Sequence, residues 1–364
     1  MENIRRPVFL KPDHEDFFFK MHREIQETVL KNNNLQTRNI VKTIVLLLIY
    51  FTSYTCILLF GNTTPLLFLF YMIAGLTMIT LFVNSFHDAA HGALFKKPKH
   101  NHWFTSILAL FGSNTWLWTK RHIALHHAYP NIQHWDIDIR QSNVVRIFPQ
   151  SPLSKFHKYQ HIYMWFLYPL YSLNWIFIRD FRDFFTESDN YIKRITNIPR
   201  IEVYKLLAAK IISLLFIIGI PLLVLGQPWY LIITAWLFMH ISGSMLGVIA
   251  LISTHADEHA RFPDPENGKI EMTWAEHQMH TTKDFSTDSP IANFLFGGFT
   301  HHIAHHLFPG VAHTYYPQIT PIIRRYATEY GLPYTCYPFY EAIRSHFRML
   351  RNNGTENIFN SGEL

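Results

Sequence analysis

Eight histidines lie in three short clusters whose spacing suits metal binding. On an α-helix, residues three or four apart share a face, so each cluster should present two imidazoles in one direction. The last histidine of each doublet lies about 100° further around the helix and can reach a second ion. The pattern predicts a multi-metal centre built from the clusters His87-Asp-Ala-Ala-His91, His122-Ile-Ala-Leu-His126-His127 and His302-Ile-Ala-His305-His306.

The ligand type indicates a pair of ions. Eight imidazoles are too many for one ion, since a catalytic zinc ion typically takes three protein ligands and a water. The clusters contain no thiolate, and carboxylates are few near them, so an imidazole-rich iron pair matches best. A zinc pair or a mixed pair remains open on ligand type alone. A single histidine pair would be ordinary surface decoration, and the combination of three clusters favours the metal site.

Two long apolar stretches must position these clusters. No Asp, Glu, Lys, Arg or His occurs from residue 43 to 86, and His240 is the only such residue from 211 to 254. Each stretch is about twice the ~20 residues that one helical crossing needs. Turn-forming residues interrupt both, at Gly61-Asn-Thr-Thr-Pro65 and at Gly226-Gln-Pro228. We therefore expect two helical hairpins with spans near 43–60, 65–86, 207–225 and 229–253.

Charge indicates how the hairpins are oriented. Neither turn carries a charge, whereas the Lys and Arg residues lie outside the two apolar stretches. The positive-inside tendency then places both termini, the central segment and all three clusters in the cytoplasm. The expected fold is an all-α integral membrane protein with four transmembrane helices. A helical cytoplasmic cap, residues 87–206 and 255–364, would hold the metals, in a bacterial inner membrane or an endoplasmic reticulum membrane.

Composition agrees with a membrane enzyme. Hydrophobic residues make up 49% of the chain and charged residues 16%, too apolar for an ordinary soluble protein and too polar for a pure channel bundle. The net charge of +6 suits a cap near anionic headgroups or an anionic substrate, and no nucleic-acid partner is expected. Two cysteines offer no disulfide framework and no cysteine-based metal site.

Two further apolar segments are too short to cross a bilayer. Residues 103–118 and 162–178 are rich in Trp and Tyr, as helices that lie in the membrane interface often are. We expect both to be interface helices, with a buried helix of the cap as an equal alternative for the second.

The three motifs resemble the histidine boxes of the membrane fatty acid desaturases. The likeness runs from about residue 60 to about residue 350, which indicates a domain over 43–350 between an N-terminal segment, 1–42, and a tail, 351–364. The Leu307–His313 run, Tyr315-Tyr-Pro317 and Ser345-His346 resemble the linoleoyl-CoA and front-end acyl desaturase branch. That branch usually begins its third box with Gln, where this chain has His302.

The resemblance implies two iron ions held by the box histidines and by one further ligand after the last span. His255 is expected there, with His259 as the alternate. The implied reaction uses O₂ to remove two hydrogens from adjacent methylene carbons of an acyl-CoA or acyl-lipid, forming a cis double bond and water. No bound organic cofactor is expected. The chain lacks the His-Pro-Gly-Gly motif of a fused cytochrome b5 domain, so we expect a separate ferredoxin, cytochrome b5 or similar electron carrier.

Further residues are expected to support the site. The histidine ligands need acceptors for their second ring N–H, and the candidates are Asp88, Asn131, Asp136, Asp138 and Glu258. For Asp136 and Asp138, exposed carboxylates are the alternative. Walls of an apolar acyl tunnel are expected from Trp116, Trp118, Trp135 and Phe299, with core packing as the alternative. Phosphates of CoA could be bound by cations, with lipid-surface charge as the alternative, at Arg146, Lys155, Arg179, Arg182, Lys193 and Arg194.

Two other functions compete with desaturation. A hydroxylase of alkyl chains, carotenoids or sphingoid lipids would use the same metal site, and its products would distinguish it. A metal transporter or sensor would carry ionisable residues along its spans, and the apolar stretches offer only His240. We interpret His240 as a packed polar residue, and we set His301 aside because it would face away from His305.

Overall fold

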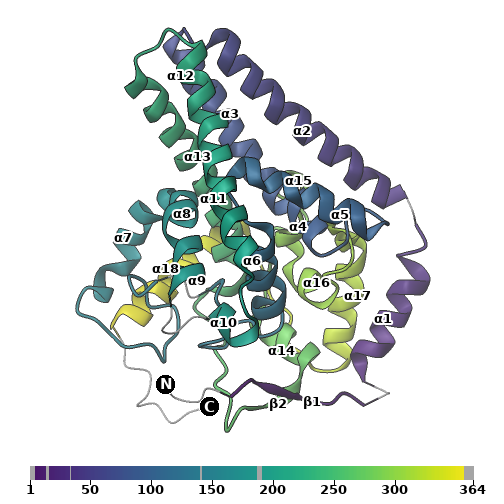
Figure 1. Cartoon of the computed structure of the whole chain (residues 1–364). Coiled ribbons are helices and arrows are strands. Elements are labelled where there is room, and N and C mark those ends of the chain that lie inside the picture. The colour runs from purple at the N-terminus through teal and green to yellow at the C-terminus, as the bar shows by residue number, and fades with distance from the viewer. Residues whose placement is uncertain (1–4, 14–15, 33, 140–141, 187–190, 356–364) are drawn as a thin grey trace. The chain divides into compact units, whose positions relative to one another are not determined.

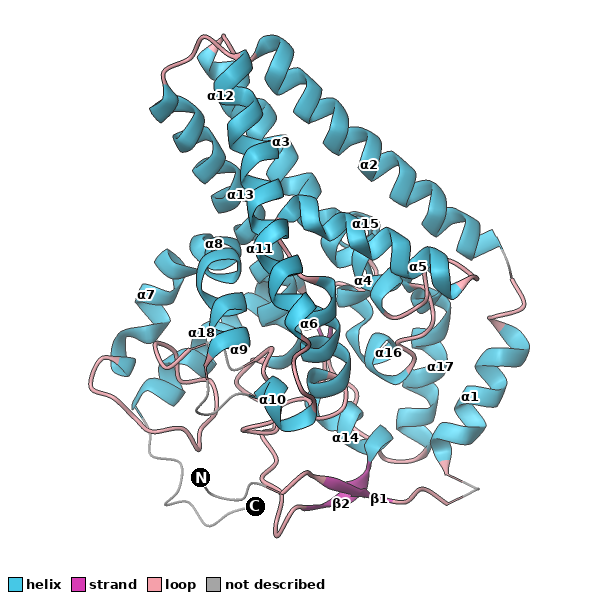
Figure 2. Ribbon diagram, viewed as in Figure 1, coloured by secondary structure: helices cyan, strands magenta, loops and turns pink. Residues whose placement is uncertain are grey.

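The computed structural model describes residues 5–13, 16–32, 34–139, 142–186 and 191–355. Helices dominate these residues, with two short sheets of two parallel strands (Figures 1 and 2). They form two compact units, which we describe separately. The hairpin unit comprises 37–120 and 166–248, and the histidine unit comprises the described residues up to 36, 121–165 and those from 249 onward. The predicted all-α class is confirmed.

Four helices in the described part of the chain are long and apolar enough to cross a membrane. Each contains one predicted span, except that Leu225 is the C-cap of its helix. The helices extend beyond the predicted spans because backbone hydrogen bonding continues where hydropathy falls. Their bounds are Asn34–Phe60 (α2), Thr64–Ala90 (α3 Thr64–Leu81, a π-turn and α4 His87–Ala90), Arg200–Val224 (α11 Arg200–Leu214, a π-turn and α12 Ile220–Val224) and Trp229–His255 (α13).

The two hairpin turns lie side by side within the hairpin unit. The Gly226 amide donates to Oδ1 of Asn62 (2.8 Å), and Nε2 of Gln227 donates to the carbonyls of Asn62 (2.6 Å) and Gly61 (3.2 Å). Both hairpins therefore point the same way. The first histidine box, at the end of α4, lies at the end of its hairpin opposite the turn.

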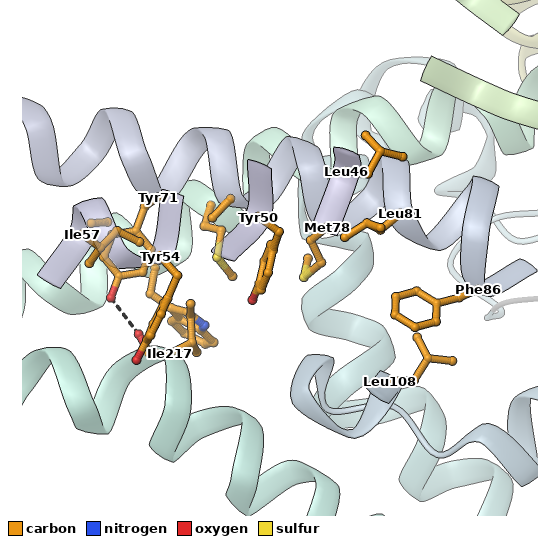
Figure 3. Close-up of a cluster of buried hydrophobic side chains, with 14 of the residues drawn as sticks. Leu46, Tyr50, Tyr54, Ile57, Tyr71, Met78, Leu81, Phe86, Leu108 and Ile217 are labelled. Atoms are coloured by element: carbon orange, nitrogen blue, oxygen red, sulfur yellow. Dashed lines mark hydrogen bonds between the residues drawn. The ribbon is translucent and has the colours of Figure 1, made fainter. Parts of the chain in front are cut away.

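Buried tyrosines join the two hairpins. The hydroxyls of Tyr54 on α2 and Tyr71 on α3 donate to the carbonyls of Phe216 and Ile217, each at 2.7 Å. These carbonyls belong to the π-turn Leu215–Gly219, where the backbone hydrogen-bond pattern departs from that of an α-helix. Figure 3 shows the tyrosines among the apolar side chains of α2 and α3. The hairpin unit thus combines an apolar core with paired polar groups.

Glycines bring α3 and α13 into close contact. A Cβ on Gly75 would lie 2.1 Å from the carbonyl oxygen of Met239, and a Cβ on Gly243 would lie 2.7 Å from the carbonyl oxygen of Gly75. Small residues are typical where membrane helices pack with their backbones in contact. His240, one turn before Gly243, is buried with its Nδ1 2.8 Å from Oγ of Ser172, which confirms it as a packed polar residue.

The two short apolar segments are helical but interrupted. The first breaks at Gly112, whose φ is 71°, and the second is a series of short helical turns. Phe166 and Ile178 of the second segment are 75% and 59% exposed. Location in the membrane interface remains a prediction. The helices over these segments and after them are α5 Pro98–Thr105, α6 Thr115–Arg121, α7 Gln160–Leu167, α8 Tyr171–Asn174, α9 Asp180–Phe185 and α10 Tyr191–Ile195.

The histidine unit joins segments that are far apart in the sequence. Strand β1 (Val8–Leu10) pairs with β2 (Lys269–Thr273), and β3 (Asp284–Phe285) pairs with β4 (Cys336–Tyr337). The predicted N-terminal segment packs here, and Phe18 stacks on Phe308. Residues 356–364 of the predicted tail, and residues 1–4, lie outside the described residues. The helices of this unit are α1 Phe17–Thr28, α14 Trp274–Thr281, α15 Pro290–Phe296, α16 His302–Leu307, α17 Tyr316–Glu329 and α18 Phe339–Thr355.

The glycine contact yields a prediction. Gly75→Ala should lower the melting temperature of the protein in detergent, because the new methyl group would meet backbone, and such overpacking costs about 1–3 kcal/mol. Gly219→Ala is the matched control, since the atoms nearest to its Cβ would be those of the Leu215 side chain at 3.4 Å and the Leu214 carbonyl oxygen at 3.9 Å, which are ordinary van der Waals contacts. This control should melt at or above the wild-type temperature, because alanine favours helix over glycine. Equal melting temperatures for the two variants would contradict the close contact.

Candidate metal centre

Seven of the nine predicted ligands lie in the histidine unit and form two groups. The first group contains His122, His127 and His305, and the second contains His126, His255, His302 and His306. Within each group the potential ligand nitrogens lie within 4.8 Å of one another. The other two predicted ligands, His87 and His91, belong to the hairpin unit, where their ring centroids are 5.0 Å apart.

The second box is not α-helical, so the expected pairing of His122 with His126 is wrong. His122–His126 form a π-turn, and the His127 amide donates to the His122 carbonyl at 2.9 Å. A turn with hydrogen bonds between residues five apart brings such residues onto one face. Nε2 of His127 consequently lies 3.1 Å from Nε2 of His122, and His126 belongs to the other group.

The third box also pairs differently from the prediction. On α16, His302 groups with His306 rather than with His305, because a residue four positions along lies closer to the same face than one three positions along. Nε2 of His255 is 2.7 Å from Nε2 of His302 and 3.2 Å from that of His306. Nε2 of His305 is 2.9 Å from Nε2 of His127.

The structure distinguishes the two candidates for the further ligand. His255, the last residue of α13, is buried and lies in the second group. The side chain of His259 is 69% exposed and lies 3.8 Å from Glu258. His255 is therefore the histidine that the fold directs toward the other candidate ligands.

Hydrogen bonds to Nδ1 fix several rings. Asp138 contacts Nδ1 of His122 at 2.9 Å, and both carboxylate oxygens of Asp136 contact Nδ1 of His126 at 3.0 Å. Both carboxylates therefore lie against histidine rings. Since a carboxylate accepts, the ring proton is assigned to Nδ1, and the lone pair of Nε2 points into the group.

Three supporting groups were missed by the sequence analysis. The Thr281 carbonyl accepts from Nδ1 of His255 (3.1 Å), and Oε1 of Gln278 accepts from Nδ1 of His306 (2.8 Å). The Tyr316 hydroxyl, which donates to the Phe308 carbonyl, lies 3.3 Å from Nδ1 of His305. Two of these groups are on α14, which begins with a capping box of Thr273 and Glu276. This capping pattern is the one sequence feature that could have indicated the helix α14, which carries these two groups.

Two predicted ring acceptors have other partners. Nδ2 of Asn131 donates to the carbonyls of His255 (3.1 Å) and Arg261 (3.0 Å), so Asn131 holds the backbone next to a ligand instead of a ring. Its φ of 58° lets its amide donate to Asp136. Glu258 lies beyond the end of α13 and turns toward α18, where it accepts from Arg348 (2.8 Å) and Ser345 (3.3 Å).

In the hairpin unit, Asp88 accepts a hydrogen bond from Nδ2 of Asn39 on α2, at 2.7 Å. The first box is thereby tied to the first spanning helix. Trp118 is buried in the same unit and packs against Phe82 with ring centroids 4.9 Å apart. Trp116 is half-buried.

Of the predicted tunnel residues in the histidine unit, one contacts a candidate ligand. Phe299 is buried and stacks on His302, with ring centroids 5.1 Å apart and an interplanar angle of 24°. Trp135 packs against Tyr129 at 5.3 Å, which corresponds to the alternative of core packing.

The proposed phosphate-binding role of Arg146 is wrong. Its side chain is buried, and its guanidinium donates to the carbonyls of Ser151 and Asn353, each at 2.7 Å, and to that of Pro149. A guanidinium enclosed by carbonyls is a structural link. Arg179 is also buried, over the ring of Trp175. Of the other candidate cations, Lys155 and Arg194 are exposed, and Arg182 and Lys193 are partly so.

The electrostatics suit metal ions. Burial lowers the pKa of His302 and His306 well below the usual value, and neighbouring histidines lower it further. Burial also lowers the pKa of His122, although Asp138 opposes the shift. Neutral imidazole is the form that binds metals. Two nitrogens each about 2.0–2.1 Å from one ion would lie about 3 Å apart, close to the separations found here.

Acid should destabilise the metal-free protein. Burial lowers the pKa of His346 to about 4, and its Nδ1 is 2.6 Å from the Ala256 carbonyl. As the pH falls, the His346 ring is therefore protonated in the unfolded chain before it is protonated in the folded one. The free energy of unfolding keeps its full value above about pH 6.5 and falls as the pH approaches 4, by on the order of 3 kcal/mol for such a shift. His346→Gln keeps a donor without a titrating ring. Its melting temperature should fall less than that of the wild type between pH 7 and 4.5, and equal falls would contradict this role.

The contact of Gln278 with His306 also yields a prediction. Gln278→Met removes the acceptor at similar volume and should weaken metal binding about 10- to 100-fold, as loss of a ring partner typically does. Gln278→Glu keeps an acceptor and should retain affinity. Metal titration of both purified variants measures the difference. Equal affinities in wild type and Gln278→Met would show that this contact does not orient the ring.

The comparisons with known proteins agree with the site. The family model described as fatty acid desaturase matches residues 62–338. The chain is 30% identical to an acyl-lipid (8-3)-desaturase of Physcomitrium patens over 94% of this chain and 72% of that protein. It is 31% identical to an sn-1 linoleoyl-lipid 6-desaturase of Synechocystis sp. over 86% of this chain and 88% of the relative. The chain belongs to the fatty acid desaturase family and is a membrane oxidoreductase that desaturates fatty acyl chains.

Proposed function

We propose that this protein is an O₂-dependent desaturase that uses two iron ions to introduce a cis double bond into the acyl chain of a lipid. The observation that carries the proposal is the convergence of buried, neutral imidazoles in two groups of the histidine unit. The proposed ligands of the two ions are His87, His91, His122, His126, His127, His255, His302, His305 and His306.

The named relatives favour a lipid-linked substrate. Both are described as acting on acyl-lipid or linoleoyl-lipid substrates, and we extend this class to the present chain, with acyl-CoA as the alternative. The burial of Arg146 and Arg179 removes two of the six cations that the sequence offered for a CoA phosphate. Fewer cations available for CoA phosphates also favour a lipid-linked substrate over acyl-CoA.

The chain's own residues would position the reactants. A bound iron pair would supply the O₂ chemistry that removes hydrogens from unactivated methylene carbons. Such carbons carry no acidic proton, so the protein's contribution is to orient groups and to exclude water. Asp136 and Asp138 hold the protons of their partner rings on Nδ1, which keeps Nε2 free for metal. Phe299, flat against His302, provides an apolar surface beside the second group.

We further propose a multi-pass arrangement with both termini and the metal site in the cytoplasm, of a bacterial inner membrane or an endoplasmic reticulum membrane. The lack of charge in both hairpin turns supports this sidedness. The reaction needs electrons, which we assign to a carrier such as a ferredoxin or a cytochrome b5.

The test is the fatty acid profile of a desaturase-poor host that expresses the chain and is fed saturated, monoenoic and dienoic acids. Gas chromatography–mass spectrometry of methyl esters should reveal a new double bond and its position. His305→Ala/His306→Ala should abolish the product, because it removes one imidazole from each group. His259→Ala, at an exposed histidine outside both groups, is the matched control and should retain activity.

Two outcomes would contradict the proposal. Hydroxylated acyl chains in place of unsaturated ones would identify a hydroxylase. A double bond that still forms in the His305→Ala/His306→Ala variant would show that these histidines do not hold the catalytic metals.

A further inference from the structure

We propose that Asp284 positions the third histidine box, although it lies outside all three boxes. The inference rests on the proposed function for the identity of the metals that the box binds. It assigns Asp284 no contact with substrate or metal. Its role is to fix the helix that carries three of the ligands.

The need for such a residue arises from the shortness of α16. Six residues, His302–Leu307, carry three candidate ligands, and an isolated helix of this length is not stable by itself. The first amides of a helix also lack partners within it. The N-cap residue, His301, does not cap them, since its side chain makes no cap hydrogen bond and its Nδ1 contacts Oγ1 of Thr320 at 2.8 Å.

The carboxylate of Asp284 meets this need. Oδ1 accepts from the Ile303 amide at 2.9 Å, and the neighbouring His302 amide also favours the charged form of this carboxylate. The backbone at the residue that follows a candidate metal ligand is therefore tied to Asp284. The other oxygen, Oδ2, accepts from the Tyr334 hydroxyl at 2.6 Å. Hydrogen bonds to an ionised group are stronger than those between neutral groups, which suits an anchor.

Asp284 is itself held in place. It is fully buried, and its own amide donates to the Thr335 carbonyl at 3.0 Å, where β3 pairs with β4. The guanidinium of Arg324, on α17, lies 5.0 Å from the ring centroid of Tyr334 and donates to Oγ1 of Thr287 at 3.0 Å. The anchor thus connects α16 to a strand pair and to α17.

His302 depends on this anchor more than the other ligands of its group. His126, His255 and His306 each have a partner at Nδ1. Among the residues that the structure describes, Nδ1 of His302 has no hydrogen-bond partner. Its ring is set by stacking on Phe299, by contacts with the neighbouring histidine rings and by the position of its backbone. A shift of the backbone at residue 302 would move Nε2 away from its 2.7 Å approach to His255.

The experiment compares four full-length variants in detergent: Asp284→Ala, Asp284→Asn, Tyr334→Phe and Arg146→Met. Arg146→Met is the matched control, because it also removes a buried charged group of the histidine unit, one that the structure bonds to backbone carbonyls away from the boxes. Titration with Co²⁺ followed by visible absorption reports affinity and ligand geometry. Hydrogen exchange of peptides that cover residues 302–307, in the metal-free protein, reports the anchor itself.

We expect Asp284→Ala to bind one Co²⁺ at least about 10-fold more weakly, in the range typical of lost supporting contacts. The backbone amides of residues 302–307 should also exchange hydrogen faster in this variant than in the wild type. Asp284→Asn, which keeps an acceptor, should lose less Co²⁺ affinity than Asp284→Ala. Tyr334→Phe should lose less affinity than Asp284→Asn. Arg146→Met should melt at a lower temperature but bind two Co²⁺ with wild-type affinity. Adding His302→Ala to Asp284→Ala should weaken binding little further, because both changes act on one ligand.

The inference is overturned if Asp284→Ala keeps wild-type affinity and exchange, or if its losses only match those of Arg146→Met. It is also overturned, with the proposed function intact, if residues 302–307 lose protection while metal affinity is unchanged. A wild-type protein that binds no pair of ions would instead refute the proposed metal centre. Exchange at residues 302–307 would then still decide whether Asp284 anchors the helix.

Discussion

Neutral imidazole nitrogens that face one another in a buried site are the constraint on which the histidine unit depends. In the second group, Nε2 of His255 approaches two other Nε2 atoms at 2.7 and 3.2 Å. Where Nδ1 carries the ring proton, these atoms present lone pairs, which repel one another unless a cation lies between them. Away from water, the repulsion is weakly screened. The arrangement therefore favours a bound cation, and it needs a scaffold that holds the rings close together.

The scaffold meets this requirement from separate parts of the chain. The π-turn of the second box divides its histidines between the two groups, and the end of α13 adds His255. Helix α14 contributes acceptors to two rings, and Asn131 fixes the backbone at His255. Because several segments share the orientation of the rings, loss of one contact should weaken the site without abolishing it. The hairpin unit, with its tyrosine contacts and glycine packing, supplies the membrane-embedded part of the protein.

The sequence predicted the features that leave a periodic or compositional pattern. Charge-free stretches located the four long helices, and the histidine spacing located the candidate ligands. The distribution of ligands between groups could not be predicted, because a π-turn arises from backbone hydrogen bonding and has no residue signature. Likewise, the supporting residues lie far in sequence from the third box. Gln278 contacts the ring of His306, and Asp284 accepts from the backbone beside His302. The sequence suggested that Arg146 was a surface cation, because the backbone carbonyls that accept its hydrogen bonds cannot be recognised from residue types.

The central claim, that the two groups of imidazoles each hold an iron ion, is tested most directly by anomalous diffraction at the iron edge from crystals of the iron-loaded protein. The account predicts two peaks, one beside His126, His255, His302 and His306, and one beside His122, His127 and His305. A single peak, or peaks outside these groups, would contradict it.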